Sequence, residues 1–248
     1  MLLTDALGNG TELDPPALKA RYDHCGYVAI RSIFSSDEVE SWSAEAERLW
    51  RLPEVDDPRS SRVDWRTTIA GTRTAERLDP VTDISPLFQH LSTDQRLLTL
   101  AGYLLGEEAI LFKDKLIIKP PGVNGYPLHQ DFAYIEHFGF KGSQQLAVCI
   151  AIDATDVAAG PIEFFPFLHH RRLPSPPGRP GEADEAALDM DSGELLQMEP
   201  GDLVIFSSLC PHRSAPNRSG HCRRLLFLTY NARSSGDFYD TYYRTGKP

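Results

Sequence analysis

The sequence lacks three features that would each point to a particular class of protein. No apolar run approaches the roughly 18 residues that a membrane-spanning helix needs. Residues 1–5 show neither the basic start nor the apolar stretch of a secretory signal. Basic charge is scarce, because 25 Lys and Arg stand against 35 Asp and Glu, for a net charge of −10. We therefore expect a cytoplasmic protein whose partner is neither nucleic acid nor a membrane.

Paired cysteines are also missing. The four cysteines are scattered through 248 residues, and none has the Cys-x-x-Cys spacing of a structural zinc site. We predict reduced thiols rather than a disulfide framework. The hydrophobic content of 41% and charged content of 24% are typical of one globular domain, here 1–248, present as a monomer or a homodimer.

Hydrophobic periodicity predicts helices first and short strands later. Helices are expected at 14–24, 36–50, 86–91 and 94–105, and strands at 26–30, 109–119, 145–153, 161–167, 203–206 and 223–230. The polar segment 53–75 predicts irregular structure. The pattern indicates a mainly β fold with flanking helices, a sandwich or barrel with a helical buttress (about 14–105), a β core (about 109–232) and an aromatic tail. We favour a tail that packs as a strap against the helices, with a lid over the site as the alternative.

One His-x-Asp motif carries the functional argument. On an extended chain, His129 and Asp131 point to the same face and Gln130 points away. Non-haem Fe(II) oxygenases hold iron with two histidines and one carboxylate on one face of the metal. His212 is the candidate for the third ligand. Although a lone His-x-Asp is common by chance, we predict that His129, Asp131 and His212 form a catalytic iron site.

Iron held in this way keeps three open positions, which suits chelation by 2-oxoglutarate and binding of O2. The far carboxylate of 2-oxoglutarate then needs a cation, and arginine binds carboxylates through two parallel hydrogen bonds. Arg223 and Arg224 follow His212 by 11 and 12 residues. Alternation does not choose between them, because both faces of the predicted strand are apolar.

Two further residues are candidates for contact with 2-oxoglutarate. Tyr134 is a candidate hydrogen-bond donor near the iron, and packing in the core is its alternative. Lys113, Lys115 and Lys119 share one side of the predicted strand 109–119. We favour a solvent-facing side for these lysines. The alternative is that Lys115 projects into the barrel toward 2-oxoglutarate or an anionic substrate.

Three stretches resemble the phytanoyl-CoA dioxygenase (PhyH-like) family of Fe(II)/2-oxoglutarate oxygenases. They are 118–134, 160–166 and 212–223. The resemblance implies a double-stranded β-helix (a jelly-roll, cupin-like core), selects Arg223 over Arg224 as the 2-oxoglutarate clamp and adds Ser214 as its helper. Two departures are the sequence at 166–169, where the family has a Pro-Gly-Ser-His turn, and Arg213, where it often has glycine.

The combined interpretation is an Fe(II)/2-oxoglutarate-dependent dioxygenase that hydroxylates an unactivated C–H bond of a small molecule and releases succinate and CO2. Desaturation or ring formation would use the same residues. Arg66, Arg73 and Arg77, with Lys115, indicate an anionic substrate. The alternatives are a zinc hydrolase on the same three ligands and a non-catalytic jelly-roll that binds a ligand. A halogenase is disfavoured, because halide needs the position that Asp131 occupies.

Overall fold

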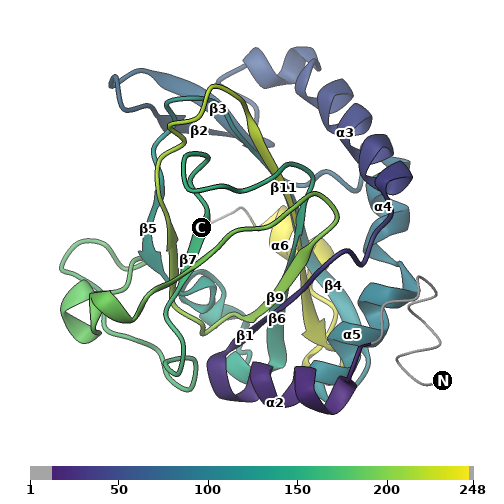
Figure 1. Cartoon of the computed structure of the whole chain (residues 1–248), viewed down its shortest axis with the longest axis vertical. Coiled ribbons are helices and arrows are strands. Elements are labelled where there is room, and N and C mark those ends of the chain that lie inside the picture. Colours follow the sequence, from purple (N-terminus) through teal and green to yellow (C-terminus); the bar gives the residue numbers. More distant parts are fainter. Residues whose placement is uncertain (1–12, 246–248) are drawn as a thin grey trace.

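Two antiparallel sheets face each other in the computed structural model, which describes residues 13–245; the segment 1–5 discussed above lies outside this part. Figure 1 shows the sheets, with helices along one side of the larger one. The seven strands of the large sheet are, in spatial order, β1 (Tyr27–Ile30), β9 (Leu203–Ser207), β6 (Gln145–Ala151), β11 (Arg223–Ala232), β4 (Ala109–Lys119), β3 (Arg73–Leu78) and β2 (Val63–Thr67). Those of the small sheet are β5 (Tyr126–His129), β10 (His212–Ser214), β7 (Ile162–Phe164) and β8 (Glu194–Leu196).

The helices begin and end where local side chains satisfy the free backbone groups. Ser35 and Glu38 form a capping box at the start of α3 (Ser36–Trp50). Glycines in the left-handed conformation end α2 (Pro15–Cys25) and α5 (Gln95–Leu105). The remaining helices are α4 (Pro86–Ser92) and α6 (Tyr239–Arg244), and short 3-10 turns include η1 (Pro53–Asp56), η2 (Asp131–Tyr134), η3 (Glu136–Phe138), η4 (Gly142–Gln144), η5 (Glu185–Ala187), η6 (Met190–Ser192) and η7 (Arg233–Ser235).

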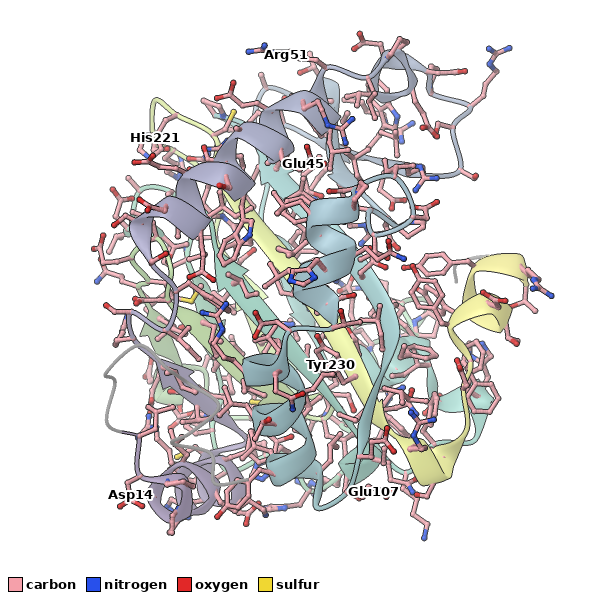
Figure 2. The ribbon with its side chains drawn as sticks, turned by 90° about the vertical axis from the view of Figure 1, so that its right-hand side faces the viewer. Asp14, Glu45, Arg51, Glu107, His221 and Tyr230 are labelled. Carbon is pink, nitrogen blue, oxygen red and sulfur yellow. The ribbon has the colours of Figure 1, made fainter. Side chains whose placement is uncertain are left out.

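The outer face of the large sheet forms the main core with the helices. Figure 2 shows α3, α4 and α5 lying across this face, with Tyr230 labelled on β11 beneath them. Tyr230 is fully buried and its hydroxyl donates to the Ser92 carbonyl at 2.9 Å, which ties β11 to the end of α4. The apolar residues of this layer alternate along the strands, for example Leu226, Leu228 and Tyr230 on β11.

The inner face of the large sheet meets the small sheet and leaves room between them. On β6 the inward residues are small: Ala147, Cys149 and Ala151. Larger side chains from β9, β11 and β7 fill only part of the space: Phe206, Phe227 and Phe164. The remaining space is a pocket that β4 and β11 line on one side and β5 and β10 on the other, with charged residues among the apolar ones.

Two predictions about the strands are wrong. The segment 53–75 is not irregular throughout, because it contains η1, β2 and the start of β3, and these two strands extend the large sheet beyond β4. Lys113 and Lys119 do not face solvent, because both are buried on the inner face of β4. Alternation identified the shared side of these lysines, but that side is the interior of the barrel.

The aromatic tail packs as a strap, but it lies against β4 and not against the helices as we favoured. Helix α6 lies along the part of β4 that β3 does not pair with, and β3 pairs only with Leu116 and Ile117. The Tyr243 hydroxyl accepts from the Asp114 backbone N–H at 3.0 Å, where a neighbouring strand would otherwise bond. Tyr239 donates to the Asp114 carboxylate at 2.7 Å. The tail therefore covers an open strand edge.

Within residues 13–245, no helix is both long and apolar enough to cross a membrane. All four cysteines are free, three of them buried and Cys222 exposed. Unpaired thiols agree with the reduced state predicted from the sequence.

Replacing Asp114 with alanine should destabilise the protein by about 3 kcal/mol, because four donors to its buried carboxylate would lose their acceptor. The donors are the backbone N–H groups of Val81 and Thr82, the Thr82 hydroxyl and the Tyr239 hydroxyl. Urea unfolding measures the change. Asp240→Ala, which removes an exposed carboxylate of α6, is the control and should cost less than about 0.5 kcal/mol. Equal losses in the two variants would contradict the anchoring role of Asp114.

Candidate metal and co-substrate site

The strand register brings the two candidate histidines side by side. His212 on β10 pairs with His129 at the end of β5, and their ring centroids lie 4.2 Å apart. Asp131 follows at the start of η2, with its Oδ1 3.9 Å from His129 Nε2. One ligand atom from each of the three residues lies within 4.8 Å of the others, and all three residues are buried. A single metal ion fits this separation.

Backbone carbonyls fix the orientation of both imidazoles. His129 Nδ1 lies 2.8 Å from the Pro127 carbonyl and His212 Nδ1 lies 3.0 Å from the Cys210 carbonyl. Each Nδ1–H therefore donates to a carbonyl, which leaves the Nε2 lone pair for a metal. Sequence reasoning assigned Cys210 no role, and only the fold shows that its carbonyl orients a candidate ligand.

The site favours the protonation states that iron needs. Burial and the neighbouring His212 lower the pKa of His129 to about 3, and burial also lowers the pKa of His212. Although burial alone would raise the pKa of Asp131, Lys115 and Lys113 hold it well below its usual range. At neutral pH the cluster thus offers two neutral imidazoles and one carboxylate, which is the donor set of non-haem iron.

A pocket opens beside the three residues, which form part of its lining. Arg223 lines it and is only 2% exposed, and its Nε has no hydrogen-bond partner among the described residues. Arg224 points to the outer face, where it binds Asp153 and Ser43. The fold therefore separates the two arginines and leaves Arg223 as a buried cation that has no anionic partner among the described residues.

Ser214 presents its hydroxyl to the same cavity. Its Oγ accepts from Lys119 Nζ at 3.0 Å and from the Tyr126 backbone N–H at 3.2 Å. Because both acceptor positions are used, the Ser214 hydrogen is left to donate into the cavity that the residue lines. Burial, reinforced by Arg223, lowers the pKa of Lys119 to about 6.

The other candidates lie around the cluster. Lys115 lines the cavity, with its Nζ 4.9 Å from the Phe227 ring, and burial lowers its pKa to about 8. The Tyr134 ring centroid is 6.2 Å from that of His129. Gln130 points away from the metal-ligand face, as predicted. Its amide nitrogen donates to the carbonyls of Arg171 and Leu209, so its role is to hold these segments together.

Sequence reasoning missed a buried polar cluster on β2, β3 and β5. The Glu76 carboxylate accepts a hydrogen bond from the Tyr126 hydroxyl, and the Arg66 guanidinium stacks 3.6 Å from the Tyr126 ring. Arg77 binds Asp64 at 2.6 Å, while Arg73 is exposed. None of the three arginines that indicated an anionic substrate lines the cavity.

Comparison with known proteins gives the class. The family model of phytanoyl-CoA dioxygenase (PhyH) matches residues 22–225. A methylphosphonate hydroxylase of Gimesia maris is 33% identical over 90% of this chain and 83% of its own length. A 2-aminoethylphosphonate dioxygenase of an uncultured bacterium is 27% identical over 88% of this chain and 82% of its own. The crystal structure of EctD from S. alaskensis, with 2-oxoglutarate and 5-hydroxyectoine, has a TM-score of 0.75 at 24% identity over 92% of this chain and 79% of that one.

These findings confirm the predicted class: the protein is an Fe(II)- and 2-oxoglutarate-dependent dioxygenase that acts on a small molecule. The structural likeness confirms the jelly-roll fold. Since the family model covers most of the chain and a 33%-identical relative covers nine-tenths of it, the chain belongs to the phytanoyl-CoA dioxygenase family. A zinc hydrolase and a non-catalytic jelly-roll are correspondingly disfavoured.

Lowering the pH should destabilise the metal-free protein through His129. Its folded pKa of about 3 lies below the unfolded value of about 6.5, so the unfolded state binds the extra proton and stability is lost as the pH falls below 6.5. Between pH 7.5 and 5.5 this histidine alone should cost about 1.4 kcal/mol. Urea unfolding of EDTA-treated protein should show that His129→Gln loses this dependence. The exposed His137→Gln should retain it, and equal pH profiles in all three proteins would contradict the assignment.

Proposed function

We propose that His129, Asp131 and His212 bind Fe(II), and that Arg223 and Ser214 bind the far carboxylate of 2-oxoglutarate. The observation that carries the proposal is an unpaired, buried guanidinium facing the same cavity as a buried His-Asp-His cluster. A metal site alone would not require Arg223. A dianionic chelator would require both the metal site and Arg223.

Bound iron with 2-oxoglutarate supplies the activation of O2, and the chain's own residues supply position and a dry environment. The carbonyls of Pro127 and Cys210 hold the two imidazoles in one tautomer. Arg223 and the Ser214 hydroxyl fix one end of 2-oxoglutarate. The apolar inward residues Phe164, Phe206 and Phe227 exclude water from the reacting C–H bond.

Tyr134 and Lys115 complete the proposed surroundings of the co-substrate. The half-buried Tyr134 lies against His129 on the side of η2, where its ring would cover the metal. Lys115 is within electrostatic range of Asp131 and lines the cavity, so its ammonium would face either 2-oxoglutarate or the substrate. We propose hydroxylation of an unactivated C–H bond as the outcome.

The substrate is proposed to be small, because the pocket beside the three residues must also hold 2-oxoglutarate. Two relatives are named for the oxidation of methylphosphonate and 2-aminoethylphosphonate. Organophosphonates are therefore the first compounds to test.

We further propose one dioxygenase domain over residues 1–248, working in the cytoplasm as a monomer or a homodimer. The large sheet supports a single unit, because β1 pairs with β9 and β3 pairs with β4, which in turn pairs with β11. Four free thiols support a reducing compartment.

The first experiment adds Fe(II) and then 2-oxoglutarate to metal-free protein without O2, and follows the visible charge-transfer band of the chelate. The wild type should show the band. His129→Ala should lose it, while the exposed His137→Ala should keep it. No band in the wild type would overturn the proposal.

Arg223→Leu should raise the 2-oxoglutarate concentration for half-maximal band intensity about 100-fold, because two charge-assisted hydrogen bonds are lost. The matched control is Arg224→Leu, since Arg224 lies next in sequence but binds Asp153 on the outer face. The control should leave this concentration within about threefold of the wild type. Equal effects of the two substitutions would rule out Arg223 as the clamp.

A further inference from the structure

Two buried ammonium groups at the site make no direct contact with the machinery described so far, although both lie within electrostatic range of Asp131. Lys113 and Lys115 occupy alternate positions on β4 and point to its inner face. Among residues 13–245, neither Nζ makes a hydrogen bond or an ion pair. Lys115 lines the cavity, and Lys113 is 6% exposed, with its Nζ 5.7 Å from the Tyr242 ring of α6.

Other basic side chains of the same interior already have partners. Lys119 donates to the Ser214 hydroxyl and the Ala215 carbonyl. Arg213 pairs with Glu163, and Arg66 donates to the Gly125 carbonyl at 2.9 Å. The contrast shows that this fold normally provides partners for its buried charges, which makes the two free ammonium groups informative.

When iron and 2-oxoglutarate are bound, the negative charges of the site do not neutralise these two lysines. Asp131 is the only carboxylate among the described residues that line the cavity. Asp131 and dianionic 2-oxoglutarate together balance Fe(II) and Arg223, with both histidines neutral. The charges that remain are those of Lys115 on the cavity wall and of Lys113 beside it, with Asp79 within electrostatic range of Lys113. Like charges buried side by side are costly unless a ligand neutralises them.

We propose that Lys113 and Lys115 form an anion-binding subsite, and that the substrate is a small organic molecule whose doubly charged phosphonate or phosphate group binds there. The inference rests on the proposed iron and 2-oxoglutarate site. Lys115 contacts the anion from the cavity wall. Lys113 contacts it from the next inward position of β4, on the side of the aromatic strap. The subsite places the carbon beside the anionic group near the metal.

Stability of the ligand-free protein gives a test that needs no substrate. In an Asp131→Asn background, where the lysines no longer face a buried carboxylate, Lys113→Met and Lys115→Met keep the apolar stems and remove the unbalanced charges, so each should raise the urea midpoint of the metal-free protein. The control Lys141→Met changes an exposed lysine and should leave the midpoint unchanged. A lower midpoint in both cavity variants would mean that the lysines are structural and would overturn the inference.

Binding tests the chemistry directly. The anaerobic Fe(II)–2-oxoglutarate complex is titrated with methylphosphonate, methyl phosphate, propionate and the neutral ester dimethyl methylphosphonate, and the shift of the visible band is followed. A dianion should bind the wild type at least about 10-fold more tightly than propionate or the ester. The comparison of methylphosphonate with methyl phosphate identifies which dianion is preferred.

Each methionine variant should weaken dianion binding at least about 10-fold and leave the 2-oxoglutarate requirement within about threefold. Lys113→Arg and Lys115→Arg keep the charge and should retain most of the affinity, while Lys141→Met should behave as the wild type. Unchanged dianion affinity in the double methionine variant would overturn the inference, as would a loss confined to 2-oxoglutarate binding.

The anion subsite and the iron and 2-oxoglutarate site would be overturned by different results. A normal 2-oxoglutarate band that no dianion perturbs would overturn the anion subsite and leave the iron and 2-oxoglutarate site standing. The absence of the band itself would overturn the proposed function.

Discussion

The alternation of side chains along β4 and β11 is the constraint on which the rest of the structure depends. Because the two strands pair along their whole length, each position faces either the helices or the barrel interior. Apolar residues on the outer face bury the helices, whereas Arg223 and the three lysines are on the inner face. One face of the large sheet thus packs against the helices in the hydrophobic core, and the other face lines a cavity with charged residues.

The cavity is built at a cost in stability. A fully apolar interior would hold the sheets together more strongly than buried ammonium and guanidinium groups do. Ion pairs around the cavity, such as Arg77 with Asp64 and Arg213 with Glu163, limit this cost. Cations without protein partners remain where ligands would bind, which is the pattern expected of a site arranged for its ligands rather than for the empty state.

Much of the fold followed from the sequence. The strand 109–119 and the helix beginning after Ser35 were located correctly, because long apolar periodicity and a capping box are local signals. β2 and β3 were missed, because inward-facing Arg66 and Glu76 break the apolar alternation that marks a strand. The lysines were assigned to solvent for a related reason: polar residues on one side of a strand usually face water, and only the second sheet shows that this side is enclosed.

The candidate site was more predictable than its surroundings. The spacing of His129 and Asp131 restricts their directions locally, whereas the contact with His212 depends on the register of β5 and β10, which no local pattern specifies. The carbonyls of Pro127 and Cys210 could not be foreseen, since every residue has one and only the fold selects those that meet a ring nitrogen.

The tyrosines of α6 have a consequence for how this chain avoids other copies of itself. Tyr243 occupies backbone groups of β4 that would otherwise be open along the edge of a seven-stranded sheet. An uncovered strand of this kind, rich in Ile, Leu and Phe, is a template for pairing with a strand from another molecule. A protein without α6 would therefore be prone to sheet extension between molecules and to aggregation, so this helix protects solubility as well as covering β4 beside Lys113.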